Sequence, residues 1–115
     1  MNKNSAIQSL PPLLEVIRRF DLNPRKSLGQ NFLLDLNITN RIARIGGDLT
    51  QNNIVEIGPG PGGLTRALLD NSAKQITTVE RDPRCAAAIH ELAGYYPNKL
   101  KVVEGDALKI RIQDI

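Results

Sequence analysis

Residues 54–64 read IVEIGPGPGGL, a run of mostly apolar residues that passes directly into a glycine-rich turn. The residues after the turn, GGLTRALLD (62–70), place Leu64, Ala67 and Leu68 at helical spacing. The sequence therefore predicts a strand, a tight turn and a helix in direct succession, which is how a βαβ unit begins.

The chain beyond this turn continues the same alternation. QITTVE (75–80) is rich in β-branched residues and predicts a second strand, and KLKVVE (99–104) predicts a third. Between them Asp82 and Pro83 occupy the N-cap and N1 positions of a helix. Its inner face is predicted to carry Cys85, Ile89, Leu92 and Ala93. Strands that alternate with helices predict an α/β fold with a parallel sheet and right-handed crossovers, β-α-β-α-β, over residues 51–115.

Residues 1–50 form the other predicted unit, a helical segment with basic residues. PPLLEVIRRF (11–20) predicts one helix, and Asp35 can cap a second that Gly46 and Gly47 end. The apolar face of the first helix is formed by Leu13, Leu14 and Ile17, and that of the second by Ile38, Ile42 and Ile45.

Composition limits the classes of protein. The chain has 115 residues, 41% of them apolar and 23% charged, with no apolar run long enough to span a membrane and no apolar signal core. We therefore expect a cytoplasmic protein. Cys85 and His90 are the single cysteine and histidine, so we expect no metal site and interpret them as a buried thiol and a solvated imidazole.

The net charge of +3 comes from the N-terminal part of the chain. Residues 1–50 hold seven Lys and Arg against four Asp and Glu, whereas residues 51–115 hold eight of each sign. This excess suits contact with a polyanion such as RNA, although a solvated basic face is the simpler interpretation.

The glycine turn fits two fingerprints. Gly58, Gly60 and Gly63 have the spacing of a dinucleotide-binding loop, and Glu56 followed by Gly58, Gly60 and Gly62 has that of methyltransferases that use S-adenosylmethionine (SAM). Two prolines, at positions 59 and 61, each remove a backbone N–H that a phosphate would need. The turn therefore favours SAM over NAD.

Acidic residues support the same choice. Glu80 ends the second strand, where a carboxylate can accept hydrogen bonds from ribose hydroxyls, and Asp106 follows the third, where it can accept from an adenine amino group. SAM is cationic and suits such a pocket better than an anionic dinucleotide does. The role of Glu56 stays open: it either contacts the ligand or orders the glycine loop by accepting its N–H groups. We interpret Asp82 as a helix cap rather than a ligand.

With these residues the chain resembles the bacterial small-subunit ribosomal RNA adenine N6,N6-dimethyltransferases. The matching motifs are KSLGQNFLLD (26–35), EIGPGPGGLT (56–65), VERD (79–82) and EGDAL (104–108). The related enzymes that modify large-subunit rRNA usually have SQNF where this chain has GQNF, and a lysine where it has Pro61. The resemblance implies the first half of a Rossmann-like SAM-dependent methyltransferase domain, preceded by N-terminal helices.

The resemblance also implies roles for individual residues. Asn31 and Leu33 are expected to contact the methionine part of SAM, Gly58 to face it with its backbone, Glu80 to hold the ribose hydroxyls and Asp106 the adenine amino group. Gln30 and Phe32 are expected to shape the mouth where the target base enters.

The implied activity is the transfer of methyl groups from SAM to N6 of two adjacent adenosines in small-subunit rRNA, within the pre-30S particle, by a monomer that needs no metal and no membrane. The family's Asn-Leu-Pro-Tyr motif, which grips the base, would lie beyond Ile115, so no catalytic residue is assigned. Alternatives are a non-enzymatic RNA-binding or assembly factor, a relative of the mitochondrial transcription factors that share this fold, and an NAD-dependent oxidoreductase.

The family's later strands and helical C-terminal domain have no counterpart in these 115 residues. We therefore expect the strand at 53–58 to expose an unpaired apolar edge. We also expect the chain alone to be marginally folded or prone to aggregate, to bind SAM weakly and to methylate nothing.

Overall fold

The computed structural model describes residues 10–22 and 34–115. Helices and strands follow in the predicted order, two helices and then β-α-β-α-β, with two short 3-10 turns at the end. Their bounds are α2 (Leu13–Arg19), α4 (Leu36–Ile45), β1 (Asn53–Ile57), α5 (Gly63–Asp70), β2 (Gln75–Glu80), α6 (Pro83–Tyr95), β3 (Leu100–Glu104), η1 (Ala107–Lys109) and η2 (Ile112–Asp114).

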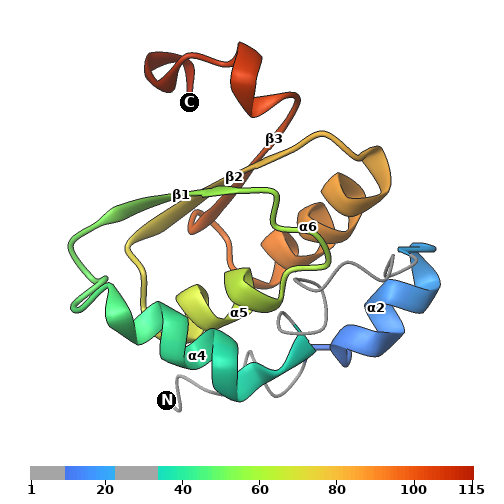
Figure 1. The fold of residues 1–115 in the computed structure, drawn as a ribbon, viewed down its shortest axis with the longest axis horizontal. Coiled ribbons are helices and arrows are strands. Elements are labelled where there is room, and N and C mark those ends of the chain that lie inside the picture. Colours follow the sequence, from blue (N-terminus) through green and yellow to red (C-terminus); the bar gives the residue numbers. More distant parts are fainter. Residues whose placement is uncertain (1–9, 23–33) are drawn as a thin grey trace.

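The three strands form one parallel sheet in the order β1-β2-β3, as predicted. Ile57 of β1 pairs with Val79 of β2, which pairs in turn with Val103 of β3, so the strands end almost level with one another. The helices α4, α5 and α6 lie on one side of this sheet (Figure 1). The level strand ends create a common edge from which the glycine loop and the acidic turns emerge.

The main hydrophobic core lies between the sheet and these helices. Ile76 of β2 and Ile89 of α6 are completely buried at its centre. The other buried members are Leu10, Ala43, Leu49, Ala67, Leu68, Leu69, Ala73, Leu92 and Leu100. Leu68 of α5 and Leu92 of α6 are both buried in this core, which confirms the predicted inner faces of the two helices. Their side chains pack against the face of the sheet that carries β-branched residues.

The helix ends confirm the predicted capping residues. The Asp35 carboxylate accepts hydrogen bonds from the backbone N–H groups of Asn37 and Ile38, and the Asp82 carboxylate accepts one from that of Arg84. Gly46 is the C-cap of α4 and is followed by Gly47 at a φ of 75°. These caps satisfy backbone groups that a helix end otherwise leaves without partners.

The buried faces of α2 and α4 differ from the sequence prediction. In α2, Leu13 and Val16 are buried while Leu14 is 63% exposed, and in α4 the buried residues are Thr39 and Ala43. Ile42 and Ile45 are exposed instead. The small side chains of Thr39 and Ala43 allow α4 to approach α5 closely, where the amide of Asn71 donates a hydrogen bond to the Asn40 side chain at 3.3 Å.

Strand β1 is an edge strand in the part of the chain that the structure describes, as the sequence predicts. It pairs with β2 alone, and Val55 and Ile57 are 49% and 60% exposed on the face opposite the helices. No helix of the described residues is long and apolar enough to cross a membrane. The division of the chain at residue 50 and the marginal stability of the chain remain predictions.

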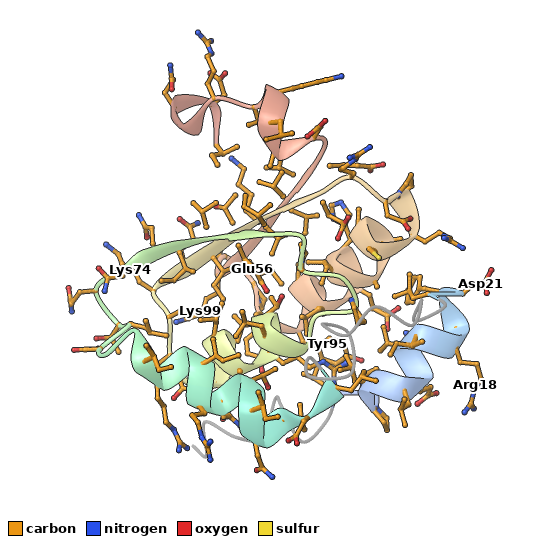
Figure 2. All side chains as sticks on the ribbon, viewed as in Figure 1. Arg18, Asp21, Glu56, Lys74, Tyr95 and Lys99 are labelled. Carbon is orange, nitrogen blue, oxygen red and sulfur yellow. The ribbon has the colours of Figure 1, made fainter. Side chains whose placement is uncertain are left out.

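Glu56 is a buried acid between β1 and α5 (Figure 2). Its Oε1 accepts a hydrogen bond of 2.5 Å from the hydroxyl of Thr65, which is fully buried. Burial raises the pKa of Glu56 from 4.5 to about 7, and the Thr65 hydrogen bond opposes this shift only in part. The carboxyl group is therefore protonated much more readily near neutral pH than an exposed glutamate is.

The raised pKa of Glu56 predicts a pH dependence of stability. Between pH 4.5 and about 7 the folded chain binds more protons at this site than the unfolded chain, so stability falls as pH rises through this window. The loss reaches about 3 kcal/mol. The substitution Glu56→Gln removes this pH-dependent loss. The free energy of unfolding is measured by urea titration at pH 4.5 and 7.5, with a stabilising osmolyte present. Between these two pH values wild type should lose more stability than the variant.

The control for that measurement is Glu104→Gln, at the exposed end of β3. The free energy of unfolding of this variant should change with pH as that of wild type does. Parallel profiles for wild type and Glu56→Gln would show that Glu56 does not titrate in this window.

Gly62 predicts a second stability effect. It precedes α5 at a φ of 102°, and a Cβ there would lie 3.1 Å from Cδ1 of Ile89 in the core. Gly62→Ala should therefore reduce the free energy of unfolding by roughly 1–3 kcal/mol. In Gly94→Ala the new Cβ meets nothing within 4 Å, and this control should gain up to about 1 kcal/mol in urea titration because alanine favours a helix. Equal effects of both substitutions would contradict the assigned strain.

Candidate cofactor-binding site

Backbone hydrogen bonds bring three predicted site residues to one edge of the sheet. The N–H of Gly58, just after β1, donates to the carbonyl of Val79 at 2.9 Å. The N–H of Gly105, just after β3, donates to the carbonyl of Glu80 at 2.8 Å. Gly58, Glu80 and the Gly105-Asp106 turn therefore lie side by side at the carboxyl ends of the strands, where parallel sheets bind ligands.

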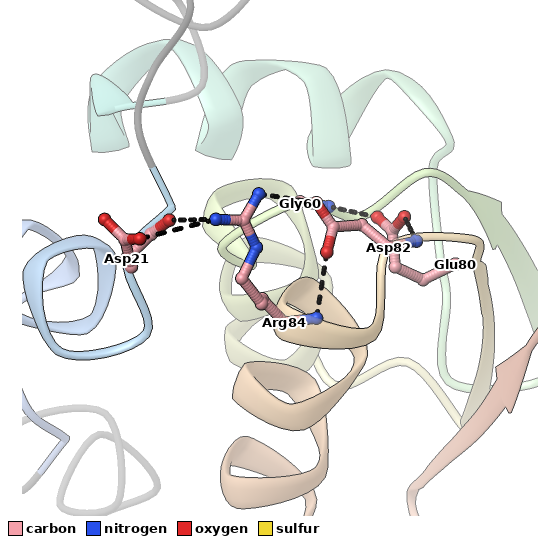
Figure 3. A network of polar contacts seen from close by, with 5 residues as sticks. All are labelled: Asp21, Gly60, Glu80, Asp82 and Arg84. Carbon is pink, nitrogen blue, oxygen red and sulfur yellow. Dashed lines mark hydrogen bonds and ion pairs between the residues drawn. The ribbon is translucent and has the colours of Figure 1, made fainter.

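The Glu80 carboxylate connects the glycine loop to the start of α6. Its Oε1 accepts a hydrogen bond from the N–H of Gly60 at 3.2 Å, and its Oε2 accepts one from the N–H of Asp82 at 2.9 Å (Figure 3). The residue is only 9% exposed. Each carboxylate oxygen has a further lone pair, so Glu80 is held in place and can still accept a hydrogen bond from a ligand hydroxyl.

The contacts of Glu56 and Glu80 correct part of the sequence interpretation. The alternative that Glu56 orders the loop by accepting its N–H groups is wrong, because the contact from Glu56 goes to the Thr65 hydroxyl. Glu80 accepts the loop N–H instead. Glu56 fastens β1 to α5 beneath the loop, and Glu80 fastens the loop to β2.

The loop from Gly58 to Gly62 has no free backbone donor. The N–H groups of Gly58 and Gly60 are donated to Val79 and Glu80, and that of Gly62 is donated to the carbonyl of Pro59 at 3.1 Å. Pro59 and Pro61 have no N–H. A pyrophosphate is bound by free N–H groups, so this loop is not built to hold one.

The shape of the loop fits a ligand that packs against its backbone. Gly58 and Gly60 have φ values of 67° and 57°, which side-chain-bearing residues rarely adopt. A Cβ at either position would meet no atom within 4 Å and would project into open space beside the loop. These features, with the carboxylate of Glu80, suit a cofactor that carries ribose hydroxyls and positive charge, and SAM carries both.

Asp106 lies on the neighbouring turn and is half-buried. Its Oδ1 accepts a hydrogen bond of 2.9 Å from the N–H of Leu108 and so caps η1. Within residues 10–22 and 34–115, its Oδ2 accepts no hydrogen bond. The cap fixes the carboxylate at the sheet edge, and its role toward adenine remains a prediction.

Asn31 and Leu33, together with Gln30 and Phe32, lie outside the described residues. His90 is exposed, as expected. Cys85 is half-buried, and its pKa is raised to about 11 by burial and by the charges of Glu80 and Asp82, so its thiol stays protonated at neutral pH. In the described part of the chain no three His, Cys, Asp or Glu residues form a group that could hold a metal ion.

Two arginines lie in surroundings that the sequence does not indicate, one through burial and one through polar contacts. From the sequence alone, both Arg66 and Arg84 are interpreted as solvated surface residues. Arg66 is half-buried, and burial lowers its pKa. Arg84 donates hydrogen bonds to Asp82 and to the distant Asp21. The Pro83-Arg84 pair after a capping aspartate was the local signal for the Asp82 contact, but nothing in the sequence indicates Asp21.

Comparison with known proteins identifies close relatives. A family model described as ribosomal RNA adenine dimethylase matches residues 21–114. The chain is 61% identical over 105 residues to a ribosomal RNA small subunit methyltransferase A of Rhodopseudomonas palustris and 59% identical over 104 residues to that of Mesorhizobium japonicum. These alignments cover 91% and 90% of this chain but 37% of each relative, so the chain spans little more than a third of their length.

A solved structure shares the fold. The crystal structure of the 23S rRNA methyltransferase ErmE matches with a TM-score of 0.61 and 40% sequence identity, over 70% of this chain and 32% of that one. The fold is therefore that of the first strands of a Rossmann-like methyltransferase domain. The family match over most of the chain and the high identity to its relatives show that the chain belongs to the ribosomal RNA adenine dimethylase family.

Proposed function

We propose that this chain is the SAM-binding part of an enzyme that dimethylates N6 of two adjacent adenosines in small-subunit ribosomal RNA. The observation that carries the proposal is the glycine loop. Its backbone donors are absent or already used between Gly58 and Gly62, while the Glu80 carboxylate beside it keeps its capacity to accept. This combination favours a ligand with ribose hydroxyls and no pyrophosphate. The family and its relatives, named as ribosomal RNA small subunit methyltransferases, support the same conclusion.

Each described site residue has a distinct part in this proposal. Glu80 accepts hydrogen bonds from the ribose hydroxyls, Asp106 accepts one from the adenine amino group, and Gly58 lets the ligand lie against the backbone. Asn31 and Leu33 are proposed to contact the methionine part. Together these groups would fix the position of the cofactor, which is the main contribution that a methyltransferase makes to its reaction.

Bound SAM supplies a methyl group on a positively charged sulfur, ready for transfer to a nucleophile. The residues of this chain bind and orient that group, and Pro59 at the start of the loop is buried, so the loop backbone is held firmly. The 115 residues contain no Asn-Leu-Pro-Tyr motif to grip the target base. No residue of the chain is therefore given a catalytic role.

The substrate and setting are part of the proposal. The relatives' names indicate ribosomal RNA, and we propose the pre-30S particle in the cytoplasm, bound by a monomeric enzyme. Arg18, Arg41 and Arg44 are exposed on α2 and α4 and are available to RNA phosphates. An assembly factor that binds RNA without methylating it would use the same basic residues.

The proposal predicts selective and Glu80-dependent cofactor binding. In a titration of this chain followed by NMR, SAM should shift the amide signals of the glycine loop and NADH should not. Glu80→Gln should weaken SAM binding roughly 10- to 100-fold, because a charged acceptor for the ribose hydroxyls is lost. Glu104→Gln, at the corresponding exposed end of β3, should bind SAM as wild type does.

The outcomes separate the candidate functions. NADH binding without SAM binding would overturn the proposal in favour of an oxidoreductase. If circular dichroism shows that Glu80→Gln is folded and the variant binds SAM as tightly as wild type, Glu80 does not hold the ribose. If SAM binds, failure of the family-length enzyme to methylate 30S particles would favour the non-enzymatic RNA-binding function.

A further inference from the structure

Helix α2 is attached to α6 by an apolar cluster and by an ion pair. Val16 and Leu22 form a small apolar cluster with Ala88 of α6. In addition, Arg19 of α2 forms an ion pair with Glu91 of α6. Together these contacts hold the helix along the side of α6.

A third contact joins the end of α2 to the start of α6, next to the site (Figure 3). Nη1 of Arg84 donates a hydrogen bond to the backbone carbonyl of Asp21 at 3.0 Å and lies 3.5 Å from its carboxylate. Nη2 of the same guanidinium lies 3.4 Å from Oδ2 of Asp82. Arg84 therefore bridges two segments that are more than sixty residues apart in sequence.

The bridge leads directly to the ribose acid. Asp82, which receives the Arg84 guanidinium, donates its own backbone N–H to Glu80, and Glu80 accepts the N–H of Gly60. Hydrogen bonds from the backbone and side chain of Arg84 hold the pKa of the Asp82 carboxyl below its usual value, so it is charged at neutral pH. A continuous series of polar contacts thus runs from Asp21 to the glycine loop.

The hydrogen bond from Arg84 meets the chain at Asp21, a residue with an unusual backbone conformation. Its φ of 54° lies in the left-handed region that residues other than glycine seldom adopt. The chain turns there, so that the N–H of Leu22 donates to the carbonyl of Ile17 and the Leu22 side chain is buried. The turn at Asp21 therefore anchors the end of α2 against the core through Leu22.

We propose that Arg84 is a positioning residue that couples cofactor binding at Glu80 to the docking of helix α2, through Asp82 on one side and the Asp21 carbonyl on the other. The proposal rests on SAM being the ligand of this site. A ribose held by Glu80 restrains the carboxylate and hence the Asp82 backbone that donates to it. Because Asp82 and Asp21 share one guanidinium, restraint of the first stabilises the position of the second.

The coupling is reciprocal and modest. If bound SAM stabilises the docked helix, the docked helix must strengthen SAM binding by the same factor. The Arg84 side chain is exposed, and exposed ion pairs contribute little, so the factor should be roughly two- to five-fold. Lysine should not replace it fully, because its N–H groups lie on one nitrogen, whereas Arg84 reaches Asp21 and Asp82 with two different nitrogens.

Hydrogen exchange of the α2 amides tests the proposal. The wild-type chain and three variants, Arg84→Ala, Arg84→Lys and Arg19→Ala, are compared with and without saturating SAM. In wild type, SAM should slow exchange in α2 about two- to five-fold. In Arg84→Ala this effect of SAM should disappear, the affinity for SAM should fall by the same factor, and the loop amides should still be protected by SAM. Arg84→Lys should show an intermediate effect.

Arg19→Ala is the matched control, because it removes an ion pair between α2 and α6 that does not touch Asp82. It should speed exchange in α2 but leave the response to SAM intact. A response in Arg84→Ala equal to that of wild type would overturn the proposal, and so would a loss of response in Arg19→Ala as large as in Arg84→Ala. Absence of SAM protection at the wild-type glycine loop would instead mean that the proposed function itself is wrong.

Discussion

The site depends on how the backbone N–H groups of the glycine loop are used. Between Gly58 and Gly62 two donors are missing because the residues are proline, and the other three are donated to Val79, Glu80 and Pro59. The loop backbone is consequently held in place by the protein's own hydrogen bonds. Toward a ligand it presents no free N–H group between Gly58 and Gly62, only open space beside the glycines. Its selectivity must then come from the acidic side chains around it, of which Glu80 accepts a hydrogen bond from the loop itself.

Two buried acids beside the loop have different tasks because they have different partners. Glu80 accepts two backbone N–H groups and so connects the loop, β2 and the start of α6. Glu56 accepts one hydroxyl, from Thr65, and burial outweighs that single contact. Glu56 therefore fastens β1 to α5 beneath the loop, and its burial lowers stability near neutral pH, as happens where a functional site keeps buried acids.

Much of the fold could be predicted from the sequence because it is set by local signals. The strands follow from β-branched runs, and the helix starts from Asp35, Asp82 and Pro83, whose effects act within one turn. The buried faces of α2 and α4 could not, since the core selected Thr39 and Ala43 over Ile42 and Ile45. Close packing between helices favours small residues, and a hydrophobic pattern alone does not show which face has a neighbour.

The site shows the same division between local and long-range information. The positions of Gly58, Glu80 and Asp106 follow from the rule that ligands bind at the carboxyl ends of parallel strands, and the strand register brings these ends together. The contacts from Glu80 to Gly60 and from Arg84 to Asp21 span 20 and 63 residues, and no local pattern indicates them. These contacts require the sheet and α2 to be in place, so the fixed loop is a consequence of the tertiary fold rather than of the glycine motif alone.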